Sequence, residues 1–267
     1  MEGDPELNIG IKKSDTAKKS LKKTTIDKKE VQQFNQISGQ WWDESGALKP
    51  LHQINPARLQ YIKEQLCQYF ALDAGAAAPL KKLRIADIGC GGGLITEPLS
   101  KLGAKITGID AGEENIKAAS HHAKKQKLEI DYRVTTAEDL AETKEKFDAV
   151  IALEIIEHIA NLDLFISSCC KLLKPNGMLI FSTLNRTPKS FMLGIVAAEY
   201  ILRWLPAGTH DWEKFVKPSE IAKPLQQNGL KITDISGITY HPLKQEWSLS
   251  DDDVGVNYLL TAVQPMK

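Results

Sequence analysis

Residues 83–93 read LRIADIGCGGG, an apolar run that delivers one carboxylate, Asp87, and then enters a turn rich in glycine. A short apolar run that ends in turn residues is typical of a buried strand in a parallel sheet. From this run to residue 263, strand-like segments alternate with amphipathic ones. We therefore predict an α/β fold with a doubly wound, mostly parallel, seven-stranded sheet. The strands are expected near 83–88, 104–109, 130–135, 147–153, 178–184, 231–239 and 256–263.

The spacing of the glycines separates two kinds of cofactor. Gly89, Gly91 and Gly93 stand two residues apart, whereas a dinucleotide fingerprint needs its third glycine where the chain has Leu94. The pattern instead suits a ligand without phosphate, which lies against bare backbone and whose ammonium meets Asp87. S-adenosylmethionine is such a ligand, and D-x-G-x-G-x-G resembles the first motif of the class I methyltransferases, a Rossmann-like fold. The alternative is a glycine-rich turn that binds nothing.

Further candidates follow the other strands, because ligands of doubly wound sheets bind beyond the carboxyl ends of the strands. Asp110 follows the second predicted strand, Glu138 the third, and Leu153 ends the fourth. Asp110 lies at the distance from the glycine turn that is expected of a carboxylate accepting both ribose hydroxyls. We therefore expect adenosine at these positions, with Gly89 and Gly91 against the cofactor.

Glu154, Glu157 and His158 form a cluster after the fourth predicted strand. On a helical turn, residues at i, i+3 and i+4 share one face. Two carboxylates and an imidazole suit Mg²⁺ or Mn²⁺, with Zn²⁺ as a further option and water, substrate or a distant histidine such as His210 as a fourth ligand. A cation on a phenolic oxygen lowers its pKa, whereas without one His158 or Glu157 would act as general base. The alternative is a solvated face that binds nothing.

Two segments flank or interrupt the sheet. Residues 1–30 are rich in lysine and poor in large apolar residues, which predicts a disordered basic tail that either solubilises the chain or touches anionic lipid. Residues 31–267 are expected to form a single domain with N-terminal helices over 31–72. There, Asn55 and Pro56 open a helix that carries Arg58, either a surface charge or a clamp for a cofactor carboxylate. A helical apolar insert is expected over 186–216, as an interfacial segment, a lid over an apolar substrate or an ordinary buried helix.

Composition excludes some classes of protein. Lys+Arg and Asp+Glu both number 34, so no overall charge favours nucleic acid. The four cysteines have neither zinc-ligand spacing nor the density of a disulfide scaffold, which favours reduced cytoplasmic thiols. Because the chain shows neither a signal peptide nor a run long enough to span a bilayer, we expect a soluble or peripheral protein.

Several blocks together resemble the ubiquinone-biosynthesis O-methyltransferases. They are WWD at 41–43, LHQINPAR at 51–58, DIGCGGG at 87–93, EIIEH at 154–158, STLNR at 182–186, GTHD at 208–211 and FVKP at 215–218. The resemblance covers roughly 34–264 and implies S-adenosylmethionine-dependent methylation of hydroxyls on polyprenylated phenols and catechols, at both O-methylation steps of the pathway. It also implies cofactor contacts at Arg58, Gly89, Asp110 and Leu153, and a divalent metal, Mg²⁺ above all, at Glu154, Glu157 and His158.

The resemblance further implies peripheral association with the cytoplasmic face of the inner membrane, contact with lipid, and contact with other ubiquinone-biosynthesis proteins. A metal-dependent RNA 2′-O-methyltransferase is one alternative, because a similar Glu-x-x-Glu-His cluster serves that chemistry. Balanced charge and the apolar insert disfavour it, so no nucleic-acid partner is expected. A non-catalytic protein of the same fold that binds lipid or scaffolds a complex is the other alternative, which the intact Asp87, Gly89 and Asp110 disfavour.

Overall fold

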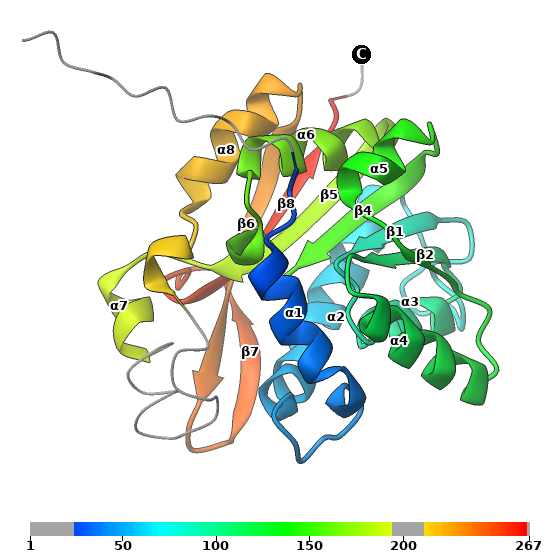
Figure 1. Ribbon diagram of the computed structural model, residues 1–267. Coiled ribbons are helices and arrows are strands. Elements are labelled where there is room, and N and C mark those ends of the chain that lie inside the picture. The colour runs from blue at the N-terminus through cyan, green and yellow to red at the C-terminus, as the bar shows by residue number, and fades with distance from the viewer. Residues whose placement is uncertain (1–23, 194–210, 266–267) are drawn as a thin grey trace, which may run out of the picture.

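The computed structural model describes residues 24–193 and 211–265, and an eight-stranded sheet lies at its centre (Figure 1). The strand order is β3-β2-β1-β4-β5-β8-β6-β7. The strands are β1 (Arg84–Ile88), β2 (Lys105–Asp110), β3 (Asp131–Val134), β4 (Phe147–Leu153), β5 (Leu173–Leu184), β6 (Lys231–His241), β7 (Glu246–Ser250) and β8 (Asn257–Val263). The first five pair in parallel, while the pairs β5–β8, β8–β6 and β6–β7 are antiparallel.

The helices supply two apolar layers, one on each face of the sheet. They are α1 (Lys28–Gln36), α2 (Lys49–Tyr69), α3 (Thr96–Lys101), α4 (Glu113–Lys125), α5 (Ala137–Glu142), α6 (Leu162–Lys171), α7 (Pro188–Ser190) and α8 (Pro218–Gln227), with 3₁₀ turns η1 (Ser38–Gln40), η2 (Ile156–His158) and η4 (Trp212–Lys214). Side chains alternate between the faces of a strand. Accordingly, Val150 packs with α5, α6 and α8, whereas Ile151 packs with α2 and α3.

The α/β class and the mostly parallel sheet confirm the prediction, but two details were wrong. The structure has an eighth strand, β7, which reads EWSLS and lies half-exposed at the sheet edge, where a strand needs no long apolar run. Asn55 is not a helix cap, because α2 begins at Lys49 with Pro50 in its first turn and continues through Pro56. Arg58 is consequently a buried residue inside a long helix.

The predicted tail and insert lie only partly within the described residues. Residues 24–30 were assigned to the tail, yet Thr25 is buried and α1 begins at Lys28, before the predicted boundary. The rest of the tail (1–23) and residues 194–210 of the insert, His210 included, lie outside the described residues. No helix in the part of the chain that the structure describes is long and apolar enough to cross a bilayer.

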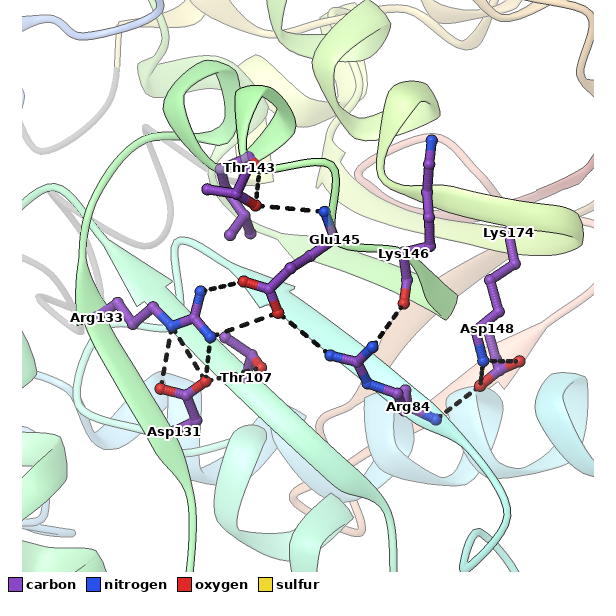
Figure 2. A network of polar contacts seen from close by, with 10 residues as sticks. Arg84, Thr107, Asp131, Arg133, Thr143, Glu145, Lys146, Asp148 and Lys174 are labelled. Carbon is purple, nitrogen blue, oxygen red and sulfur yellow. Dashed lines mark hydrogen bonds and ion pairs between the residues drawn. The ribbon is translucent and has the colours of Figure 1, made fainter.

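The amino ends of the strands carry a network of paired charges (Figure 2). Arg133 pairs with Asp131 and Glu145, and Arg84 donates to the same Glu145 carboxylate at 3.2 Å. Asp148, at the start of β4, accepts from the Arg84 backbone N–H and from Lys174. The strand order reverses between β1 and β4, which places the expected ligand crevice at the opposite, carboxyl edge.

Candidate active site

A cavity of roughly 1010 Å³ lies at the carboxyl edge of the sheet. Side chains from α1, α2, the ends of β1, β2 and β4, and the β6–β7 hairpin line it. Nine of the ten predicted site residues are among them: Arg58, Asp87, Gly89, Gly91, Asp110, Leu153, Glu154, Glu157 and His158. Residues that are far apart in the sequence therefore lie in one cavity, as the sequence analysis predicted.

The glycine turn is closely packed by other side chains. Gly89 and Gly91 both have positive φ, 74° and 53°, which side-chain-bearing residues rarely adopt. A Cβ on Gly89 would overlap Ile155, and a Cβ on Gly91 or Gly92 would overlap Trp41. Trp41 is itself held by a 2.9 Å hydrogen bond from its Nε1 to Asn115. The glycines thus make room for protein packing as well as for an approaching ligand.

Two carboxylates flank this turn, of which Asp87 is buried and Asp110 is partly buried. Asp110 accepts the backbone N–H groups of Gly91 at 3.1 Å and Gly112 at 2.7 Å, while Asp87 accepts the Thr96 hydroxyl at 2.5 Å. Burial raises the pKa of Asp87 to about 6, and burial also raises the pKa of Asp110 above its usual value. Since no cation among the described residues offsets either charge, a positively charged ligand would stabilise both carboxylates.

At the end of β4, the buried Arg58 forms an ion pair with the partly buried Glu154. Nη2 of Arg58 lies 3.0 Å from Oε1 of Glu154, which also accepts the Ser182 hydroxyl at 2.6 Å. Nη1 of Arg58 donates to Asn55 at 3.1 Å, and its Nε is buried without a hydrogen-bond partner. Arg58 is therefore no surface charge, although part of the residue lines the cavity.

Glu157 and His158 lie in the 3₁₀ turn that follows. Glu157 is buried and accepts the Thr183 hydroxyl at 2.7 Å. Burial, together with the neighbouring Glu154 charge, raises the pKa of Glu157 to about 7. Burial opposes protonation of His158, but its hydrogen bond to Glu30 and the charge of Glu157 prevail, so its pKa is raised.

The predicted cluster does not form a ready-made metal site. Within residues 24–193 and 211–265, no three His, Cys, Asp or Glu side chains are gathered so that they could hold an ion. Glu154 precedes the 3₁₀ turn with φ of 49°, so the three do not follow one regular helical face as the spacing predicted. Each has a protein partner instead: Arg58 for Glu154, Thr183 for Glu157 and Glu30 for His158.

Glu138 is the one predicted site residue that does not line the cavity. Its carboxylate accepts hydrogen bonds from the Thr24 hydroxyl, from the Thr25 backbone N–H and from the Thr25 hydroxyl, at 2.6–3.0 Å. Glu138 therefore anchors the N-terminal segment through a long-range contact of which the sequence gave no sign, and the expected cofactor contact at Glu138 stays a prediction.

The chain is similar in sequence to known methyltransferases. A family described as "Methyltransferase domain" matches residues 86–181. The chain is 48% identical over 262 residues, 98% of each chain, to the ubiquinone biosynthesis O-methyltransferase of Nitrobacter winogradskyi. It belongs to that family. A relative of the same name from Bartonella bacilliformis is 52% identical over 238 residues, covering 89% of this methyltransferase and 96% of the relative.

Solved structures show the same fold at low identity. The magnesium protoporphyrin IX methyltransferase of Synechocystis, with bound S-adenosylmethionine, superposes with a TM-score of 0.56 at 20% identity and covers 91% of this chain and 100% of that one. The PH0226 protein of Pyrococcus horikoshii gives 0.59 at 16% identity, covering 87% and 99%. The class I methyltransferase fold is thereby confirmed, and this O-methyltransferase family member is an S-adenosylmethionine-dependent enzyme.

Proposed function

We propose that the enzyme methylates hydroxyls of polyprenylated phenol and catechol intermediates in ubiquinone biosynthesis, at both O-methylation steps. One observation carries the proposal: the glycine turn with Asp110 and the Glu154–His158 group line the same large cavity. Asp110, Gly89, Gly91 and Leu153 would hold the adenosine side of the cofactor. The names of the relatives supply the pathway and support the acceptor class.

Asp87 and Arg58 would hold the amino-acid end of the cofactor. Asp87 is a buried carboxylate short of a cation, which suits the ammonium. Arg58 lines the same cavity, and its guanidinium suits the cofactor carboxylate, since a guanidinium can bind a carboxylate through two parallel donors. Isothermal titration of S-adenosylmethionine tests this placement. If the protein did not bind S-adenosylmethionine at millimolar concentration, both the proposed methyl transfer and the proposed cofactor site would be contradicted.

Methyl transfer from a sulfonium is an in-line displacement. The acceptor oxygen forms a bond to the methyl carbon while the electron pair of the breaking C–S bond goes to sulfur, which leaves a neutral thioether. The hydroxyl proton must also leave, and where no cation is bound, Nε2 of His158, a residue that lines the cavity, is the proposed acceptor. A base there contributes most when a phenol, whose pKa is near 10, has to react at neutral pH.

A divalent cation is the finer part of the proposal. The donors Glu154, Glu157 and His158 suit Mg²⁺, which would take the Nε2 lone pair of His158 in place of a proton. Burial and the neighbouring Glu154 charge raise the pKa of Glu157, and a cation would offset both effects. When bound, it would lower the pKa of the acceptor hydroxyl. Arg58 pairs with Oε1 of Glu154, so a cation would bind through the other carboxylate oxygen or replace Arg58. Methyl transfer to a short-tailed demethylubiquinol with and without Mg²⁺ tests this, and full activity after exhaustive EDTA treatment would contradict it.

Peripheral membrane association, at the cytoplasmic face of the inner membrane, and contacts with other proteins of the pathway complete the proposal. Phe191, Met192 and Leu193 are exposed apolar residues in the described part of the insert, and Leu193 also lines the cavity. Met192→Glu should reduce co-sedimentation with anionic liposomes, because a charge opposes burial in the interface. Val134→Glu, an equally exposed apolar position on β3, is the matched control. Equal binding of both variants would argue against this face.

A further inference from the structure

Helix α1 delivers a carboxylate to the reaction site from a segment far away in the sequence. Oε2 of Glu30 lies 3.0 Å from Nδ1 of His158, and both side chains are largely buried. The Phe34 ring, one helical turn later, packs edge-on against the same imidazole, with 5.1 Å between ring centroids. Two contacts from one helix therefore fix how the His158 ring is turned.

The helix itself is fastened at its amino end and along its side. The Thr25 hydroxyl and backbone N–H donate to Glu138, and the Thr25 carbonyl accepts the Ala160 N–H at 2.8 Å. The other oxygen of Glu30 accepts from Nζ of Lys214 at 2.5 Å, which ties α1 to η4 as well. Glu30 is thus held on two sides, and its carboxylate is not free to turn away from His158.

The partner of Nδ1 decides which nitrogen of His158 carries the lone pair. The carboxylate of Glu30 also accepts from the Lys214 ammonium, and an ionised carboxylate can only accept hydrogen bonds. Nδ1 must therefore carry the hydrogen, and in the neutral ring the lone pair lies on Nε2. The described residues give Nε2 no hydrogen-bond partner, and the side chain lines the cavity.

We propose that Glu30 is a positioning residue for methyl transfer, which fixes the Nδ1–H tautomer of His158 and presents Nε2 to the acceptor hydroxyl. This inference rests on the proposed function. It makes the N-terminal segment 24–37, which lies before the region matched as the methyltransferase domain, a part of the active site. A carboxylate behind a functional histidine is a common way to fix its tautomer, and loss of such a partner reduces activity about 10- to 100-fold.

Kinetics of the full chain test the role. Glu30→Gln keeps an acceptor oxygen and should lower kcat about 10-fold, whereas Glu30→Leu removes it and should lower kcat about 100-fold. The dissociation constant of S-adenosylmethionine should stay within about twofold in both. Lys29→Gln changes one charge on an exposed side chain of the same helix and should leave kcat unchanged. Unchanged kcat in Glu30→Leu, or a loss confined to cofactor affinity, would overturn the proposal.

Nitrogen NMR of the histidine rings separates positioning from mere structural support. The chain has six histidines, and the His158 signals are identified by their loss in His158→Gln. Neutral His158 should show a protonated Nδ1 in the wild type and a substantial Nε2–H population in Glu30→Leu. An Nε2–H tautomer in the wild type would overturn the proposal without any variant. Because this readout needs no substrate, failure of the wild type to methylate demethylubiquinol would contradict the proposed function alone.

Discussion

The two edges of the parallel sheet treat their charges in opposite ways. At the amino edge, Glu145 is partly exposed and bridges two arginines, and the hydrogen bond from Arg133 lowers its pKa (Figure 2). At the carboxyl edge, Asp87 and Glu157 are deeply buried, Asp110 is partly buried, and the pKa values of all three are raised, chiefly by burial. The carboxylate that supports the fold is paired with cationic side chains, whereas the three at the carboxyl edge have raised pKa values. Such perturbed pKa values are typical of functional sites.

The sharpest test of this contrast is the chemistry at His158. His158→Ala should lower kcat about 1000-fold, within the usual contribution of a positioned base, and leave the dissociation constant of S-adenosylmethionine within about twofold. Single-turnover kinetics and calorimetry measure the two quantities. His121→Ala, at an exposed position on α4, is the control. If cofactor affinity fell as steeply as kcat, His158 would belong to the cofactor half of the cavity.

The second largest effect is expected in the glycine turn. Gly91→Val combines positive φ with an overlap of Trp41, and should lower the free energy of unfolding by roughly 3 kcal/mol. For a chain of this size, that is about 10 °C in Tm. Gly229→Ala is the control, because Gly229 also has positive φ, 78°, but a Cβ there would meet nothing within 4 Å. Its expected loss in the free energy of unfolding is about 1 kcal/mol. Equal losses would show that Trp41 does not shape the turn.

A smaller effect concerns Asp87 and depends on pH. The folded protein holds this carboxyl with a pKa of about 6, above its ordinary value of 3.8. Between these values the folded state keeps a proton that the unfolded state has released, so this group lowers stability as pH rises from about 4 through 6. Asp87→Asn should therefore have a higher Tm than the wild type at pH 8 and the same Tm near pH 4, while S-adenosylmethionine binds more weakly. A lower Tm at pH 8 would contradict the raised pKa of Asp87.

The smallest effect is expected at the amino edge. Glu145→Gln removes the charge shared by Arg84 and Arg133, and because partly exposed ion pairs contribute little, the loss of stability should stay below about 1 kcal/mol. Activity and cofactor affinity should not change. Thermal unfolding and a standard methyl-transfer assay check both. A marked loss of kcat would show that the two edges are coupled.

Much of the cavity around the glycine turn could be predicted, because local sequence encodes it. An apolar run that ends in Asp87, Gly89 and Gly91 dictates a strand and a turn with positive φ, and the parallel sheet then gathers the strand ends. Asp110 and Leu153 accordingly lie in the cavity as expected. Glu138 follows the same rule yet is bound to Thr25, since the rule places the backbone and not the partner of a side chain.

The surroundings of His158 could be predicted less well. The lysine content of residues 1–30 predicted disorder, although Asp27 and Glu30 have the spacing of a helix start and Asp27 caps α1. The prediction used the composition of all thirty residues and therefore missed this helix start. The contact of Glu30 with His158 spans 128 residues and left no trace in either segment.

By itself, the sequence determined the fold, the cofactor class and the presence of Glu154, Glu157 and His158 in one cavity with the glycine turn, because each follows from short-range patterns and one rule of sheet topology. Only the tertiary structure decided which groups these side chains contact. Arg58 neutralises Glu154, Thr183 binds Glu157 and Glu30 orients His158. The physical reason is that hydrogen bonds and burial between distant segments set the charge state and direction of a side chain, and neither is written in its neighbours along the chain.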